Sequence, residues 1–181
     1  MKLSKYYNTL QEKQKELDKQ YFTSKYDLYV DMDGVLTDFE KRFGNFTDLS
    51  PGEYKDQYGE SKFWELIDKK VGVKFWVGMP WMPGGKELWS FVKHLKPKIL
   101  STPSYDDSSK LGKRLWIKNN IPGVKSHLVP RSWKQKFANE NSILIDDYKI
   151  NIDEWRSKGG IGILHTDVFS TIKQLKDLGY E

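Results

Sequence analysis

Five short apolar runs that alternate with helical patterns constrain the fold of this chain more than any other feature. The runs cover residues 26–30, 98–100, 126–129, 142–145 and 161–164. Stretches with the helical spacing of apolar residues lie between or after them, at 86–95, 105–119, 150–158 and 168–178. Strands separated by helices in this way are typical of βαβ units and a buried parallel sheet. We therefore predict an α/β fold in which a parallel sheet is sandwiched by helices.

The alternation is interrupted between residues 40 and 82, after the first expected strand. This segment is rich in aromatic residues and contains helical pieces such as 61–70. An insertion at this point would cover the carboxyl ends of the strands, where open α/β sheets bind their ligands. We expect a small helical cap at 40–82, inserted into a core that spans 26–181.

Residues 1–25 are expected to form an N-terminal helical extension, with one helix over 1–24. Its apolar side chains fall near one face, namely Leu3, Tyr7, Leu10, Leu17 and Tyr21. We expect such a helix either to pack on its own domain or to fray in solvent, and a dedicated partner site is the alternative.

The composition excludes several classes of protein. Among the 181 residues there is no cysteine, which excludes a disulfide scaffold, an iron–sulfur cluster, a Cys-ligated zinc site and a thiol nucleophile. No run approaches the roughly 20 apolar residues of a membrane span, and no signal peptide is evident, so we expect a soluble cytoplasmic protein without a membrane partner. Lys and Arg outnumber Asp and Glu by 30 to 25, which favours nucleotides, nucleic acid or phosphate esters as partners.

Two pairs of carboxylates directly follow the first and fourth expected strands. Asp31 and Asp33 belong to the string Asp-Met-Asp-Gly, and Asp146 and Asp147 are adjacent. Because the carboxyl ends of parallel strands lie at one edge of a sheet, the two pairs can converge. Clustered carboxylates repel one another, and a divalent cation with hard oxygen ligands compensates that repulsion. We predict that these four residues bind Mg²⁺.

A phosphate site is expected beside the acidic residues. Ser101 and Thr102 follow the second expected strand, and hydroxyl and N–H groups at a strand-to-helix turn can cradle a phosphate. Simple N-capping is the alternative role for such residues. Lys136 lies shortly before the fourth strand, where a lysine can neutralise a phosphate and restrain a carboxylate nucleophile.

The motifs Asp31-Met32-Asp33-Gly34-Val35, Ser101, Lys136 and Asp146-Asp147 resemble, in order and spacing, the four motifs of the haloacid dehalogenase (HAD) superfamily of phosphohydrolases. The strings DMDGVLTDFE, PWMPGGKEL and LSTPS, and the run from Lys136 to ILIDD, are similar to the 5′(3′)-deoxyribonucleotidase branch. The resemblance covers about residues 26–165, and Ser101 stands where Thr is usual in the family. It implies a Rossmann-like HAD core with a small helical cap inserted after the first strand.

The resemblance also implies a role for each motif residue. Asp31 is the expected nucleophile, which attacks phosphorus and forms an aspartyl-phosphate. Asp33 is the expected general acid toward the leaving alkoxide, and then the general base toward water. Asp31, the backbone carbonyl of Asp33 and Asp146 would hold Mg²⁺, with Asp147 acting directly or through a water. Lys136 would screen the charge of the phosphate, to which Ser101 and Thr102 would bind.

The expected activity is Mg²⁺-dependent hydrolysis of (deoxy)nucleoside monophosphates, which are small phosphate esters. The cap would recognise the base of the nucleotide. The candidate residues for contact with the base are aromatic: Phe63, Trp64, Phe75, Trp76 and Trp81. A phosphatase for a polynucleotide end or for another small phosphate ester is the enzymatic alternative. A nucleic-acid or protein-binding module is the non-enzymatic alternative, and the sequence leaves the oligomeric state open, a homodimer included.

Overall fold

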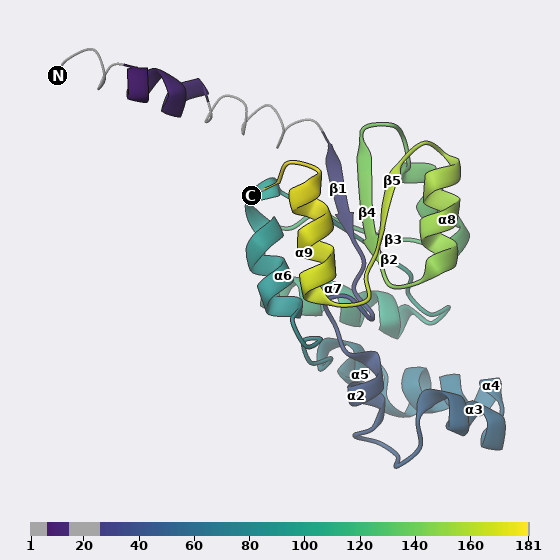
Figure 1. Ribbon diagram of the computed structural model, residues 1–181. Helices are drawn as coiled ribbons and strands as arrows, with labels where there is room; N and C mark the ends of the chain where they lie inside the picture. The colour runs from purple at the N-terminus through teal and green to yellow at the C-terminus, as the bar shows by residue number, and fades with distance from the viewer. Residues whose placement is uncertain (1–6, 15–25, 181) are drawn as a thin grey trace.

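The computed structural model describes residues 7–14 and 26–180, and a five-stranded parallel sheet forms its centre (Figure 1). The strands are β1 (Asp27–Val30), β2 (Lys98–Ser101), β3 (Ser126–Leu128), β4 (Ser142–Asp146) and β5 (Ile161–Leu164). Their order in the sheet is β3-β2-β1-β4-β5, and every pairing is parallel. Each strand coincides with one of the five apolar runs, so the predicted α/β fold is confirmed.

Strand side chains alternate between the two faces of the sheet, and each face has its own apolar core. In β1, Leu28 and Val30 pack into the larger core, which also contains buried side chains from residues 43–92 and 116–121. Tyr29 points to the opposite face, where it packs with Leu144 and Trp155. Because both faces are buried, the strands are continuous apolar runs rather than alternating ones.

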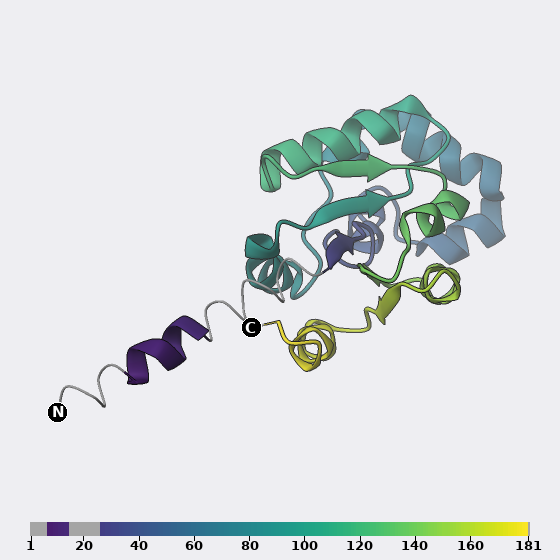
Figure 2. The same ribbon diagram turned by 90° about the horizontal axis from the view of Figure 1, so that it is seen from above.

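Helices cover the faces of the sheet, as the view from above shows (Figure 2). They are α6 (Gly85–Val92), continued by a 3₁₀ turn η2 (Lys93–Leu95), α7 (Asp107–Asn120), α8 (Lys149–Ser157) and α9 (Val168–Asp177). Helix α8 packs on β4 and β5, and α9 packs on β5 and α6. A 3₁₀ helix, η3 (Arg131–Phe137), precedes β4 and packs on α8.

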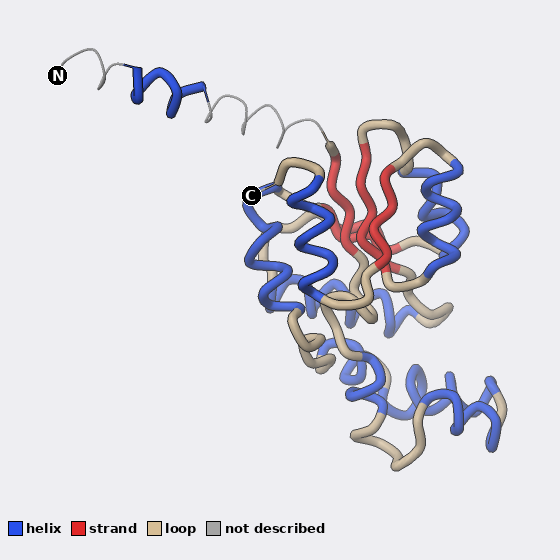
Figure 3. The backbone as a smooth tube through the Cα atoms, viewed as in Figure 1, coloured by secondary structure: helices blue, strands red, loops and turns tan. Residues whose placement is uncertain are grey.

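Short helices fill the segment between β1 and α6 (Figure 3). They are α2 (Phe39–Phe43), α3 (Pro51–Tyr58), α4 (Glu60–Trp64), the π-helix η1 (Glu65–Val71) and α5 (Val73–Val77). The helix expected at 61–70 thus consists of two pieces, α4 and η1. We call residues 39–77 the cap segment; it lies beyond the end of the sheet at which β1 leaves (Figure 1).

The N-terminal region is described only at residues 7–14, which are helical. Both side chains of the expected apolar face in this range are exposed, Tyr7 to 62% and Leu10 to 46%. The rest of the helix expected at 1–24 lies outside the described residues. Within 7–14 and 26–180, no helix has the length and apolar character needed to cross a bilayer.

Candidate active site

The pairing of β1 with β4 brings the two acidic strand ends side by side. Val30 lies opposite Ile145, and the N–H of Asp31 donates to the carbonyl of Ile145 at 2.9 Å. The next residue of each strand, Asp31 and Asp146, therefore reaches the same place at the edge of the sheet. Oxygens from the carboxylates of Asp31, Asp146 and Asp147 lie within 4.8 Å of one another.

The turn after Asp31 requires a glycine at position 34. Gly34 has a φ of +76°, which residues with a Cβ rarely adopt. A Cβ at this position would also lie 2.1 Å from Oδ2 of Asp147. The N–H groups of residues 35–37 all donate to the carbonyl of Met32, which closes the turn. The absence of a side chain at Gly34 thus leaves room for the carboxylate of Asp147 beside the turn that carries Asp31 and Asp33.

Lys134, on η3, is the lysine that contacts this carboxylate cluster. Its buried ammonium group lies 2.9 Å from Oδ2 of Asp31 and 2.7 Å from Oδ2 of Asp146. The expectation that Lys136 takes this place is wrong, because Lys136 is exposed and its Nζ lies 3.9 Å from the ring centroid of Trp133. A 3₁₀ helix has three residues per turn, so side chains two residues apart point in different directions.

Asp146 is fixed by neighbours on both of its carboxylate oxygens. Its Oδ1 accepts from the backbone N–H of Tyr148 at 2.9 Å. The side-chain amide of Asn151 lies 3.0 Å from each of the two oxygens, and Lys134 contacts Oδ2. Asn151 was not among the predicted residues; its one sequence signal is its place in the first turn of the helix that follows the acidic pair.

The cluster concentrates negative charge around two buried carboxylates, those of Asp31 and Asp146, while the side chain of Asp147 is partly exposed. Burial, and then the charge of Asp31, raises the pKa of Asp146 to about 6 and that of Asp147 to about 7. Burial lowers the pKa of Lys134, but Asp31 and Asp146 together raise it above the ordinary value of a lysine. A divalent cation favours the ionised form of neighbouring carboxylates. The three oxygen donors therefore fit a divalent metal ion.

The carboxylate of Asp33 is held by a different set of partners. Its Oδ1 accepts from the hydroxyl of Thr37 at 3.0 Å, and its Oδ2 accepts from Nζ of Lys113 at 2.6 Å. Lys113, on α7, is fully buried and also donates to Oγ of Ser101 at 2.9 Å. The prediction that the four acidic residues act together on a metal thus needs a correction: the side chain of Asp33 is outside the group of three, and its backbone carbonyl stays the candidate ligand.

Lys113 was not identified from the sequence. It is one of 30 basic residues, and it lies twelve positions after Ser101. It reaches Ser101 and Asp33 only because α7 packs on α5 of the cap segment, which no local pattern reveals.

The end of β2 supplies the two hydroxyls predicted to bind phosphate. Ser101 is buried and in contact with Lys113. Oγ1 of Thr102 is also buried, and it has no hydrogen-bond partner within the described ranges. A buried hydroxyl without a partner is costly, and an oxygen atom of a bound ligand would supply that partner.

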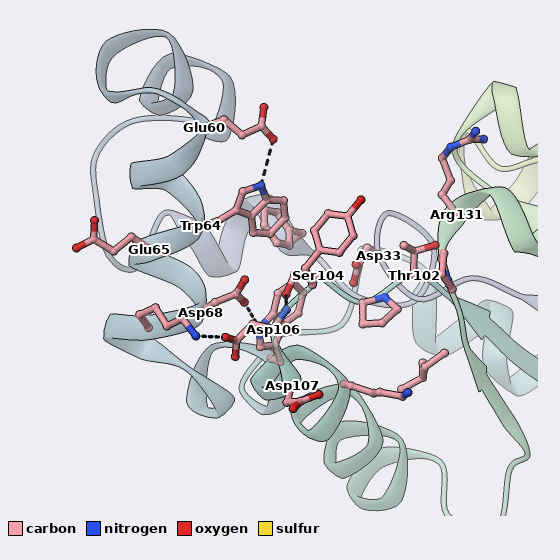
Figure 4. A pocket seen from close by; sticks show the side chains of 18 of the residues that line it. Asp33, Glu60, Trp64, Glu65, Asp68, Thr102, Ser104, Asp106, Asp107 and Arg131 are labelled. Atoms are coloured by element: carbon pink, nitrogen blue, oxygen red, sulfur yellow. Dashed lines mark hydrogen bonds and ion pairs between the residues drawn. The ribbon is translucent and has the colours of Figure 1, made fainter.

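A cavity of about 920 Å³ lies between the cap segment and the core (Figure 4). Asp33 and Thr102 line it from the core. Trp64 and Trp76 line it from the cap segment, and both belong to the aromatic residues predicted to contact a base.

The other three predicted aromatic residues are packing residues rather than lining residues. Phe63 and Phe75 are buried and contact Phe39 within the cap segment. Trp81 packs on Trp116, with 4.9 Å between the ring centroids. The burial of Phe63 and Phe75 follows from the small size of the cap segment, which needs most of its aromatic rings for its own core.

Comparison with protein-family models finds no match, and comparison with curated proteins finds none. Solved structures with similarity to this chain include a predicted phosphatase from Clostridium acetobutylicum, which is 14% identical with a TM-score of 0.49 and covers 86% of this chain and 92% of its own. A hydrolase from Streptococcus pneumoniae TIGR4 is 13% identical with a TM-score of 0.48, covering 84% and 99%. A HAD-superfamily hydrolase of subfamily IA from Geobacter sulfurreducens is 12% identical with a TM-score of 0.46, covering 77% and 86%.

Proposed function

We propose that this chain is a phosphomonoesterase of the HAD type, which uses Mg²⁺ and forms an aspartyl-phosphate on Asp31. One observation carries the proposal: Asp31 lies 2.9 Å from the buried ammonium of Lys134 and within 4.8 Å of two further carboxylates. A carboxylate can attack a phosphate dianion only where cations screen their repulsion. The cluster offers a lysine and a set of metal donors at that position.

Asp31, Asp146 and Asp147 would hold the ion, which supplies Lewis-acid stabilisation of the charge on the phosphoryl oxygens when bound. Lys134 adds a fixed positive charge beside the attacking oxygen of Asp31. The hydroxyl of Thr102 donates to a phosphoryl oxygen, which satisfies its missing hydrogen bond.

In the first step a carboxylate oxygen of Asp31 forms a bond to phosphorus, and the bond from phosphorus to the leaving oxygen breaks in line. Asp33, which lines the cavity, donates a proton to that leaving oxygen. In the second step Asp33 accepts a proton from water, whose oxygen attacks the aspartyl-phosphate. Inorganic phosphate leaves and the carboxylate of Asp31 is regenerated.

The cavity favours a nucleoside as the leaving group. Its volume of about 920 Å³ is near the upper end of the range for small-molecule sites. Trp64 and Trp76 offer ring faces for a base, and stacking of this kind is worth roughly 1–3 kcal/mol per base. A (deoxy)nucleoside monophosphate of the kind hydrolysed by 5′(3′)-deoxyribonucleotidases combines these features.

The charge of the lining disfavours a polynucleotide end as the substrate. The cavity is lined by the carboxylates of Asp33, Glu60, Glu65, Asp68, Asp106 and Asp107, and by the cations of Lys69, Lys110 and Arg131. Lys69 is moreover paired with Asp106. A second phosphate on the leaving group would meet a surplus of negative charge, so we favour a monophosphate.

A phosphate-release screen tests the proposal. It compares nucleoside monophosphates, sugar phosphates and 3′- or 5′-phosphorylated oligonucleotides, each with Mg²⁺ and with excess EDTA. We expect release from nucleoside monophosphates with Mg²⁺ and none with EDTA. Full turnover in EDTA would contradict the metal requirement, and oligonucleotide binding without any phosphate release would favour a binding module.

A further inference from the structure

Lys113 is a fully buried lysine with two polar partners that belong to the proposed reaction. Its Nζ lies 2.6 Å from Oδ2 of Asp33 and 2.9 Å from Oγ of Ser101. The exposed fraction of its side chain is 0%, against 30% for that of Asp33. A buried charge is tolerated only when it is paired, so these two contacts determine where the ammonium group lies.

Together with Thr37, Lys113 fixes both carboxylate oxygens of Asp33. The hydroxyl of Thr37 holds Oδ1 from the turn after β1, and Lys113 holds Oδ2 from α7. Two anchors on separate elements restrict rotation of the carboxylate. Proton transfer to a leaving oxygen depends on such fixed geometry.

The contact with Ser101 sets the direction of a hydroxyl group. An ammonium group can only donate hydrogen bonds, so Oγ of Ser101 is the acceptor in its contact with Lys113. The hydrogen of that hydroxyl is then available to a different acceptor, such as a phosphoryl oxygen.

The position of Lys113 depends on close packing between α7 and the cap segment. A Cβ on Gly112 would lie 2.4 Å from Cβ of Trp76, so the glycine lets the two helices approach. Nζ of Lys113 lies 5.3 Å from the ring centroid of Trp76, which lines the cavity. Lys113 therefore lies where the cavity wall, the acid–base residue and the phosphate cradle meet.

We propose that Lys113 is a positioning residue, which holds Asp33 toward the leaving oxygen and turns the hydroxyl of Ser101 toward the phosphoryl group. This inference rests on the proposed phosphomonoesterase function. It adds a second lysine to the site, with a task distinct from that of Lys134 beside the nucleophile.

The test compares two aryl esters of similar size, p-nitrophenyl phosphate and phenyl phosphate. Phenolate is the poorer leaving group, so its departure depends more on a proton from Asp33. We expect Lys113→Met to lower kcat for phenyl phosphate by about tenfold or more beyond its effect on kcat for p-nitrophenyl phosphate. This is a part of the roughly 10²–10⁴-fold rate enhancement that acid–base catalysis contributes. Lys118→Met removes an exposed lysine from the same helix and should leave the ratio of the two rates unchanged.

A double variant separates positioning from a structural role. In Asp33→Asn/Lys113→Met the carboxylate that pairs with Lys113 is removed together with the lysine. This protein can therefore still be assayed if Lys113→Met alone folds poorly. We expect the ratio of the two rates in the double variant to match that in Asp33→Asn alone, because Lys113 acts through Asp33. The inference would be overturned if the change in this ratio in the double variant equalled the product of the changes in the two single variants. It would also be overturned if Lys113→Met lowered kcat equally for both esters.

The wild-type protein distinguishes the two proposals. Release of phosphate from neither ester with Mg²⁺ would contradict the phosphomonoesterase function, and with it the role of Lys113. An active wild-type protein whose ratio of rates is insensitive to Lys113→Met would contradict the role of Lys113 alone.

Discussion

Replacement of Lys134 by Met should affect stability and turnover in separable ways. The ammonium group pairs with two carboxylates that are themselves buried, at 2.9 Å from Asp31 and 2.7 Å from Asp146. Removal of one partner from a buried ion pair costs about 3–5 kcal/mol, because the remaining charge has no compensation. For a domain of this size each kcal/mol lowers Tm by about 2–4 °C, so we expect a fall of about 6–20 °C without metal.

Added Mg²⁺ should restore part of that loss, since a ligand that binds the folded state stabilises it. Turnover should stay low, because the positive charge beside Asp31 is still missing. The assays are thermal unfolding and release of p-nitrophenol, each with Mg²⁺ and with EDTA. Lys136→Met is the matched control on the same 3₁₀ helix; its exposed side chain should change stability by less than about 0.5 kcal/mol and leave turnover intact. A Lys134→Met protein with wild-type turnover, or a Lys136→Met protein that loses it, would refute the assignment.

Three further predictions concern the same site. Trp64→Ala should lower kcat/KM for nucleoside monophosphates by the roughly 1–3 kcal/mol of a stacked base and spare p-nitrophenyl phosphate; equal losses on both would indicate a folding role. Gly34→Ala should weaken Mg²⁺ binding in calorimetry, because its Cβ would lie 2.1 Å from Oδ2 of Asp147; unchanged affinity would contradict this. Without metal, the free energy of unfolding should fall as pH rises from about 4 to about 7, since the folded pKa values of Asp146 and Asp147 are raised to about 6 and about 7. Urea titrations should show this slope flattened by saturating Mg²⁺, and a rise in stability over the same range in EDTA would contradict the sign.

The sheet and the acidic residues of the site could be predicted because local patterns determine them. Apolar runs mark buried parallel strands, and the parallel pairing then carries Asp31 and Asp146 to one edge without further information. The turn at Gly34 could also be predicted, since an acidic string that ends in glycine indicates a turn. In these cases the sequence position alone implies the place in the fold.

The lysines could not be predicted in the same way. Lys134 and Lys136 are two residues apart, and the choice between them depends on the phase of η3, a 3₁₀ helix with no apolar periodicity to reveal it. The resemblance to a family spacing favoured the wrong one. The position of Lys113 depends on the packing of α7 against α5, which is a property of the tertiary structure. The aromatic residues of the cap segment present the same difficulty, because Trp64 and Phe63 are adjacent and only one of them lines the cavity.

Lys134 and Lys113 place positive charge at two different parts of the site, one beside the nucleophile and one beside the proposed general acid. Lys134 pairs with Asp31 and Asp146, on the side where the nucleophile and the metal donors lie. Lys113 pairs with Asp33 on the side of the leaving group, where it also reaches the phosphate cradle. Before the first step Asp33 carries the proton that it donates, so two ammonium groups against the carboxylates of Asp31, Asp146 and Asp147 leave a formal charge of −1 at the edge of the sheet, which would repel a phosphate dianion. A single divalent cation makes the site net positive, so in the proposed mechanism the metal is needed for the substrate to approach as well as for the transfer itself.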